Sequence, residues 1–233
     1  MKNYSLKDFF DRYPVLTADG SHTFALRGAG EHYHSLHGAM NESLHVFIRE
    51  GFEVSVSDRT SIDILEIGFG TGLNALLSLK SALEKSVSVE YNAVEPYPLN
   101  ASEAKLLNFP SLLGNGRLLK AFTSMHSAGG SEPVEIDSLF VFRKIISTLE
   151  ELTLPESSFD LIYHDAFAPW LQPALWSRDS FEKLYRAVRP GGTLVTYSAK
   201  GSVKRILSSC GFTIENPPGP AGKREMTRAT KNL

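Results

Sequence analysis

The sequence predicts a doubly wound α/β domain with a mostly parallel sheet, preceded by a small N-terminal extension. Three features indicate this fold. A short apolar strand near 62–67 enters a glycine turn, a second strand near 87–96 contains an acid at its end, and later strands alternate with helices. Such alternation forms βαβ units with right-handed crossovers. We therefore expect ligands to bind outside the carboxyl ends of the strands.

The first 55 residues are predicted to form a hairpin and a helix. Residues 13–27 place Asp19-Gly20 between two β-prone runs, which favours a hairpin closed by a type I′ turn. Apolar residues at helical spacing predict one helix from Tyr33 to Phe52 that ends near Gly51. We expect an extension over 1–55 and the α/β domain over 56–233.

The remaining elements follow from apolar runs and from the glycines and prolines between them. Residues 99–108 are predicted to be helical, whereas 116–149 alternates short β-like runs with polar breaks. The later elements are a strand at 159–167 broken at Asp165, a helix at 176–189 stopped by Pro190-Gly191-Gly192, a strand at 193–199, a helix at 200–211, and closing strands at 212–218 and 224–230.

Composition excludes several classes of protein. The single cysteine, Cys210, leaves no disulfide framework within the chain, and the seven histidines show no metal-ligand spacing, so we expect no metal. Without a signal peptide or a long apolar run, a cytoplasmic location without membrane association is expected. The net charge of −2 argues against a general nucleic-acid binder. Gly222–Lys231 is locally basic, which fits either a solvated tail or a contact surface.

The glycine turn carries the sharpest local signal. Gly68, Gly70 and Gly72 follow a G-x-G-x-G spacing, unlike the G-x-G-x-x-G of dinucleotide sites, and Glu66 precedes them by two residues. An acid suits a cationic amino group better than a pyrophosphate, which favours S-adenosylmethionine over NAD. Glu95, at the end of the next strand, is placed to accept hydrogen bonds from ribose hydroxyls. The alternative is a turn that serves only strand–helix packing.

A second candidate segment, His164–Pro169, follows the strand near 159–164. Asp165 could accept a hydrogen bond from an amine, hold it for attack on a methyl group and take up its proton. Phe167 and Pro169 could form a flat wall against which a nucleobase stacks. The alternative for Asp165 is a helix cap or turn residue, and His164 is expected to be structural.

Several segments together resemble one enzyme family. They are LEIGFGTGLNALL (65–77), HDAFAP with LW (164–169 and 175–176), RPGGTLVTYSAKGSVKRILSSCGF (189–212), PGPAGKREMTRA (218–229) and GAMNESLHVFI (38–48). This combination is similar to the methyltransferase domain of the tRNA 5-methylaminomethyl-2-thiouridine biosynthesis enzymes. The chain resembles a stand-alone form that lacks the FAD oxidase domain, so no FAD is expected.

The resemblance implies a Rossmann-like class I fold that uses S-adenosylmethionine. It also implies methylation of the exocyclic amine of 5-aminomethyl-(2-thio)uridine at the tRNA wobble position, with the anticodon region of tRNA as partner. The implied catalytic residue is Asp165. The implied cofactor-binding residues are Glu66, Gly68, Phe69, Gly70, Thr71, Gly72, Asn74 and Glu95, and the implied substrate-binding residues are Phe167, Pro169, Glu42, Lys223 and Arg224.

One departure from the family pattern concerns the adenine contact. Ser147-Thr148 stand where relatives commonly have Gly-Asp, so the residue that contacts the adenine amino group stays open. Two other functions also remain. A small-molecule amine methyltransferase or aminopropyltransferase would share the fold, as would a nucleotide-binding module without activity.

Overall fold

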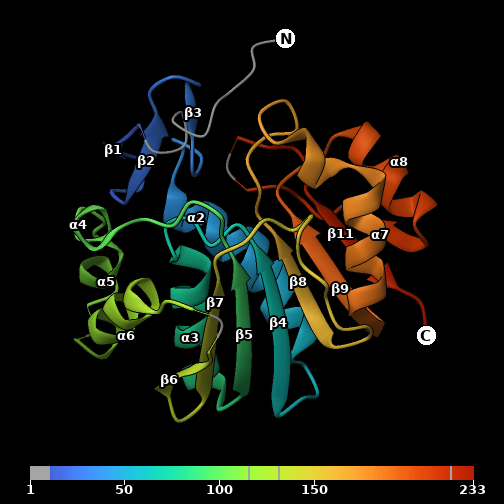
Figure 1. Ribbon diagram of the computed structural model, residues 1–233, viewed down its shortest axis with the longest axis horizontal. Helices are drawn as coiled ribbons and strands as arrows, with labels where there is room; N and C mark the ends of the chain where they lie inside the picture. The colour runs from blue at the N-terminus through green and yellow to red at the C-terminus, as the bar shows by residue number, and fades with distance from the viewer. Residues whose placement is uncertain (1–10, 115, 131, 221) are drawn as a thin grey trace.

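An eight-stranded, mostly parallel sheet forms the centre of the protein (Figure 1). It is seen in a computed structural model that describes residues 11–233 apart from 115, 131 and 221. The strands are β4 Ser61–Ile67, β5 Ser88–Val94, β6 Val134–Asp137, β7 Phe140–Ile145, β8 Phe159–His164, β9 Val188–Thr196, β10 Phe212–Glu215 and β11 Thr227–Lys231. They lie in the order β10-β11-β9-β8-β4-β5-β7-β6. β11 runs antiparallel to β9 and β10, and β6 runs antiparallel to β7.

The chain changes direction across the sheet between β4 and β8, which confirms the predicted doubly wound fold. From β4 the sheet grows through β5 and β7 to one side, and through β8 and β9 to the other. Backbone hydrogen bonds align the carboxyl ends of β4, β5 and β8. Gly68 N–H donates to Val94 O at 2.9 Å, and Asp165 N–H donates to Ile67 O at 2.9 Å. A crevice is therefore expected at this edge.

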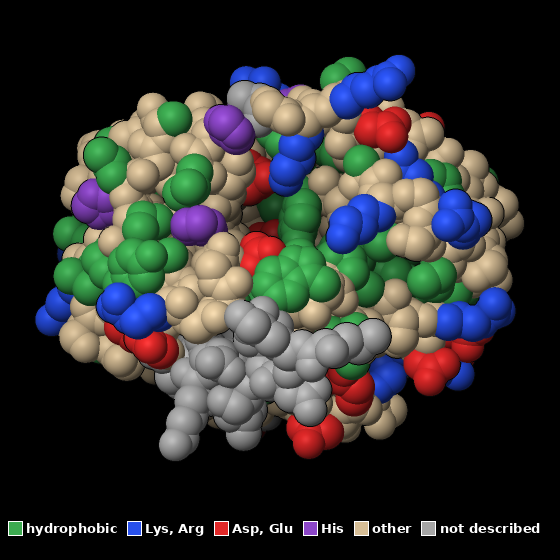
Figure 2. All heavy atoms as spheres, turned by 90° about the horizontal axis from the view of Figure 1, so that it is seen from above, with side chains coloured by type: hydrophobic (Ala, Val, Ile, Leu, Met, Phe, Trp, Pro, Cys, Tyr) green, Lys and Arg blue, Asp and Glu red, His purple; other side chains and the backbone are tan. Residues whose placement is uncertain are grey.

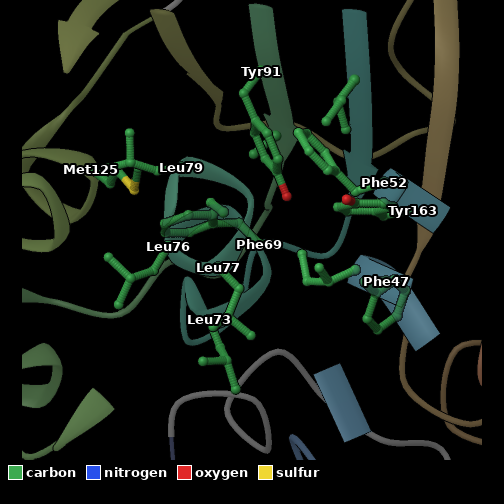
Figure 3. Packing of buried hydrophobic residues seen from close by; sticks show 14 of the residues in the cluster. Phe47, Phe52, Phe69, Leu73, Leu76, Leu77, Leu79, Tyr91, Met125 and Tyr163 are labelled. Carbon is green, nitrogen blue, oxygen red and sulfur yellow. The ribbon is translucent and has the colours of Figure 1, made fainter. Parts of the chain in front are cut away.

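Helices cover both faces of the sheet and create two apolar clusters. Along β4, Ile62 and Ile64 point into one cluster, whereas Leu65 and Ile67 point into the other. Figure 3 shows the first cluster, in which Tyr91 and Tyr163 from the sheet pack near Phe47 and the leucines of α3. The helices are α2 Ala39–Ser43, the π-helix η1 Leu44–Glu53, α3 Leu73–Lys85, α4 Ala101–Ala104, α5 Phe109–Leu112, α6 Gly116–Ser127, the 3₁₀ turn η2 Pro173–Trp176, α7 Arg178–Ala187 and α8 Gly201–Ser209.

A small antiparallel sheet precedes the core, and it confirms the predicted hairpin. Its strands are β1 Arg12–Leu16, β2 His22–Leu26 and β3 Glu31–His32. The type I′ turn was wrong, because Leu16 pairs with His22 and leaves five residues in the loop. Asp19 keeps a negative φ and uses its carboxylate to accept hydrogen bonds from the N–H groups of Ser21 and Asn41. The loop is thus anchored to α2.

Three further predictions differ from the structure. The helix predicted from Tyr33 begins only at Ala39, because residues 33–38 form bends and a turn, and it continues as the π-helix η1. Gly116–Ser127 is helical rather than β-like, since its buried side chains recur at helical spacing. The Pro190–Gly192 segment lies within β9, at a shift in register opposite β8, and α7 has already ended at Ala187.

The predicted boundary after residue 55 stays a prediction. η1 packs beside α3 on the same face of the sheet, and Phe47 and Phe52 belong to the same apolar cluster as Leu76. Of the helices in the described part of the chain, none is long and apolar enough to cross a bilayer.

Arg12 ties the small sheet to the edge of the crevice. Its side chain is 1% exposed, and its Nε and Nη2 donate to the Glu103 carboxylate at 2.7 and 2.9 Å. Nη1 also donates to the Tyr33 hydroxyl at 2.9 Å and to Tyr97 O at 3.0 Å, and Nη2 donates to Pro98 O at 3.0 Å. One buried guanidinium thus joins β1 to the segment that follows β5.

We expect Arg12→Ala to lower the free energy of unfolding by about 3 kcal/mol, because it leaves Glu103 and two carbonyl groups without a buried donor. Urea denaturation followed by circular dichroism measures this change. The control is Arg27→Ala, directly after β2, where the ion pair with Asp11 is exposed and should contribute less than about 1 kcal/mol. Equal losses from both substitutions would contradict the assignment.

Candidate active site

A cavity of about 380 Å³ opens at the carboxyl ends of the strands, below the small N-terminal sheet. Viewed from above, the molecule is hollowed at this place, with hydrophobic and acidic side chains in the hollow and Lys, Arg and His side chains nearby (Figure 2). Its walls come from the glycine turn, the loops after β5, β7 and β8, the segment around β3, and Lys223 near the C-terminus. Cavities of this size hold small molecules.

The glycine turn lets two other segments approach closely. Gly68 has a φ of +94°, and a Cβ atom there would lie 2.5 Å from the carbonyl oxygen of Asp165. Gly70 has a φ of +48°, and a Cβ atom there would lie 3.0 Å from Tyr33 Cδ1. The turn therefore meets a packing requirement, and it also lines the cavity.

Asn74 connects the buried Glu66 carboxylate to the half-buried Asp165 carboxylate at the base of the cavity. From the first turn of α3, its Nδ2 donates to Glu66 Oε1 at 2.9 Å and to Asp165 Oδ2 at 2.8 Å. Its Oδ1 is buried and has no hydrogen-bond partner in the described residues. Asn74 and Asp165 line the cavity, whereas Glu66 is fully buried behind them on the α3 side of the sheet. Asn74 thereby links Glu66 to the cavity.

Burial sets the protonation of these acids. It raises the pKa of Asp165 to about 7, and the nearby Glu42 carboxylate adds to the rise, whereas the Asn74 amide and Lys223 oppose it. Burial also raises the pKa of Glu66 well above its ordinary value, against the hydrogen bond from Asn74. The cavity therefore carries carboxyl groups whose ionisation a bound cation would favour.

Glu95 joins the loop after β5 to the glycine turn. Its Oε2 accepts a hydrogen bond from Gly70 N–H, and its Oε1 accepts one from Tyr97 N–H, both at 2.8 Å. Burial raises the pKa of Glu95, while these two N–H groups and Arg12 act against the rise. The carboxylate is thereby fixed on the cavity wall, and each oxygen keeps a lone pair for a ligand.

An ion pair between Glu42 and Lys223, which are far apart in the sequence, lines the side of the cavity near Asp165. Lys223 Nζ lies 2.5 Å from Glu42 Oε1 and 4.4 Å from the centroid of the Tyr197 ring. Glu42 Oε2 accepts a hydrogen bond from Ser35 N–H at 2.8 Å. Glu42, Lys223 and Tyr197 all line the cavity, on the side of Asp165.

Several wall residues were missed by sequence reasoning. Tyr33 lies over Gly70 and meets the Phe167 ring edge-on at 4.8 Å between centroids. His34 is buried, with Nδ1 2.9 Å from Thr23 Oγ1 and a pKa lowered to about 4 by burial. The sequence analysis did not identify these residues because it placed both in a helix, whereas they lie in a bent segment between β3 and α2.

The other predicted site residues are not all on the wall. Phe69 contributes its backbone, whereas its ring packs among Leu73, Leu76 and Met125 in the apolar core (Figure 3). Thr71 is buried in the wall and Phe167 contributes to it, but Gly72, Pro169 and the exposed Arg224 lie outside the lining.

The loop after β7 reaches the cavity where the adenine contact was left open. Thr148 lines the wall, and so does Glu150, the carboxylate two residues further along. His164 proves structural: it is fully buried, Nε2 donates to Leu175 O at 3.0 Å, and its ring packs against Trp176.

Residues 125–232 match the family profile described as S-adenosyl-L-methionine-dependent methyltransferase. This range includes the Asp165 loop and Lys223. Over this range the chain is similar to the S-adenosylmethionine-dependent methyltransferases. The profile and the relatives described next support a methyltransferase enzyme over the non-enzymatic alternative.

Two bacterial proteins of tRNA 5-methylaminomethyl-2-thiouridine biosynthesis resemble the chain over most of its length. A tRNA 5-methylaminomethyl-2-thiouridine biosynthesis bifunctional protein from Ralstonia nicotianae is 30% identical over 230 residues, which cover 93% of this chain and 34% of that protein. One from Pseudomonas fluorescens is 29% identical and covers 84% of this chain and 31% of that protein. The chain thus spans about a third of the length of these relatives.

A solved structure shows the same arrangement. The crystal structure of MNMC2 from Aquifex aeolicus superimposes with a TM-score of 0.72 at 26% identity, over 94% of this methyltransferase and 70% of that chain. The resemblance found in the sequence motifs is therefore confirmed by both sequence and structure.

We expect Asp165→Asn to stabilise this methyltransferase above neutral pH. The pKa of Asp165 is raised in the folded state, so its ionisation lowers stability as the pH rises from about 4 to about 7. The variant should be more stable by about 2 to 4 kcal/mol at pH 8, and equal to wild type below about pH 4. Chemical denaturation across this range measures the difference, with the exposed Asp58→Asn as control. A difference that does not change with pH would contradict this.

Proposed function

We propose that this methyltransferase transfers a methyl group from S-adenosylmethionine to the exocyclic amine of 5-aminomethyl-(2-thio)uridine at the tRNA wobble position. The observation that carries the proposal is the meeting, in one cavity, of the glycine turn, Asp165 and the Glu42–Lys223 pair. The similarity of nearly the whole chain to the tRNA-modifying relatives supports the choice of acceptor.

The residues present fit the methyl donor. The buried Asn74 Oδ1 lacks a partner in the described residues and is positioned to accept a hydrogen bond from the donor's cationic amino group. Glu66 would act behind it by fixing the amide. Glu95 would take the ribose hydroxyls, and Gly68 and Gly70 would allow the close approach of the ligand. Glu150 is the wall carboxylate that we assign to the adenine amino group.

Asp165 would orient the acceptor. The bound donor supplies an electrophilic methyl group on a sulfonium, and the nucleophile must be an amine with a free lone pair. A carboxylate with a pKa near 7 can accept a hydrogen bond from a neutral amine and later take up its proton. Phe167 and Tyr33 would hold the uracil ring, and the Lys223–Glu42 pair would border the same acceptor space.

We expect the purified protein and labelled S-adenosylmethionine to methylate bulk tRNA from cells that lack this activity. Nucleoside mass spectrometry should then show a new methyl group on the wobble aminomethyluridine. Asp165→Ala should lower kcat by about 100-fold or more, since both orientation and proton uptake are lost, while the affinity for S-adenosylhomocysteine stays within a few-fold.

Two results would contradict this assignment. Methylation or aminopropylation of polyamines without any transfer to tRNA would select the small-molecule alternative. Full turnover by Asp165→Ala would show that this carboxylate does not orient the acceptor.

The basic C-terminal segment is proposed to contact tRNA phosphates. Arg224 is exposed, whereas Lys223 is half-buried and paired with Glu42. We therefore test Arg224 alone and then together with Lys223. We expect Arg224→Ala to reduce the slope of log Kd against log salt by about 1, and the double variant with Lys223→Ala to reduce it further. Filter binding at several salt concentrations measures the slopes. Slopes equal to that of wild type in both variants would make the segment a solvated tail.

A further inference from the structure

Lys223 brings a primary ammonium group into the side of the cavity near Asp165. Its Nζ lies 2.5 Å from Glu42 Oε1 and 4.4 Å from the centroid of the Tyr197 ring, and these side chains all line the cavity. The Glu42 side chain is 9% exposed, whereas that of Lys223 is 34% exposed. A largely buried carboxylate is thus paired with a cation that reaches in from the surface.

The surroundings of this ammonium group form a binding site for a primary alkylammonium ion. Carboxylates and aromatic faces both bind such cations in proteins. Glu42 is fixed from the N-terminal side, because its Oε2 accepts a hydrogen bond from Ser35 N–H at 2.8 Å. Tyr197 is fixed as well, since its hydroxyl donates to Ala166 O at 2.8 Å. The wall groups are therefore held by the fold, whereas the cation itself ends the flexible stem of Lys223.

The acceptor proposed above carries the same chemical group. The lysine side chain and the aminomethyl substituent of the uridine both end in a CH2–NH3+ group when protonated. An aminomethyl group that reaches Asp165 also reaches Glu42, which is already paired. We propose that Lys223 occupies the ammonium subsite of the acceptor in the unliganded enzyme, and that the aminomethyl group of the substrate displaces it.

This exchange selects for a substrate that carries an amine. One ammonium group leaves Glu42 as another arrives, so the buried carboxylate keeps a cationic partner throughout. Uridine without the aminomethyl group brings no charge, so it cannot replace Lys223. After the exchange, Asp165 accepts a proton from the bound ammonium group, and the neutral amine then carries the lone pair that attacks the methyl group.

This inference rests on the proposed amine acceptor, and nucleoside binding tests it separately from tRNA. Titration calorimetry with 5-aminomethyluridine, in the presence of S-adenosylhomocysteine, measures binding to the subsite without phosphate contacts or turnover. We expect Lys223→Met to bind this nucleoside about 10-fold or more tightly than wild type, because the competing cation is removed. The affinity for uridine, which lacks the amine, should be the same for both proteins.

A neighbouring ion pair provides the matched control. Lys204 Nζ lies 2.9 Å from Glu225 Oε1, and neither residue is part of the cavity wall. Lys204→Met should therefore leave the affinity for 5-aminomethyluridine unchanged. Glu42→Gln should lower this affinity and, combined with Lys223→Met, should abolish the gain, because the carboxylate that binds the cation is lost. Binding of S-adenosylhomocysteine verifies that each variant is folded.

The outcomes separate this proposal from the proposed function. If Lys223→Met binds 5-aminomethyluridine no more tightly than wild type, or without measurable affinity, displacement is overturned even where wild type methylates tRNA. An equal gain for uridine would overturn it as well, since the effect would not depend on the amine. If the gain is specific for the amine but wild type does not methylate tRNA, the ammonium subsite stands and the proposed acceptor fails.

Discussion

The site depends on the burial of carboxyl groups at the carboxyl ends of the central strands. Asp165 and Glu66 share the amide of Asn74, and Glu42 is neutralised by Lys223. Each ionised carboxylate would be unfavourable in this environment without a cation or a donor. The donors in the site offset only part of the cost of burying these charges, since the pKa values of Asp165 and Glu66 remain raised. A ligand that brings positive charge next to Asp165 would complete the compensation, so the electrostatics of the wall favour a cationic ligand over an anionic one.

The N-terminal extension is part of this site rather than an appendage. Tyr33 and His34 occupy the wall from the bent, non-helical segment after β3, and Arg12 fixes the Tyr33 hydroxyl from β1. The same guanidinium binds two carbonyl groups of the loop that follows Glu95. The small sheet and the cofactor side of the cavity are thereby connected through one buried hydrogen-bonded centre, and a shift of one would displace the other.

Much of the fold followed from the sequence, because apolar strands, the glycine turn and the later strand–helix alternation are local patterns. The predictions that failed depended on tertiary contacts. The loop around Asp19 is shaped by Asn41, and the segment before α2 forms bends and a turn where periodicity favoured a helix. Among the site residues, the positions of Asp165 and Glu95 on the wall could be predicted from strand ends, whereas Asn74 was implied only by the family resemblance. The inward turn of Phe69 and the place of Tyr33 could not, since packing decides both.

The side of the cavity that we propose for the acceptor combines segments that lie far apart in the sequence. Glu42 and Lys223 lie 181 residues apart, and both flank the space next to Asp165. His45 on η1 also donates to the carbonyl of Pro218 at 2.7 Å, so the C-terminal segment is anchored to the N-terminal one at a second point. The cofactor side, by contrast, is built from the contiguous β4–α3–β5 unit. Substitutions at the chain ends should therefore affect recognition of the acceptor before binding of the donor, because the two halves of the cavity have different structural origins.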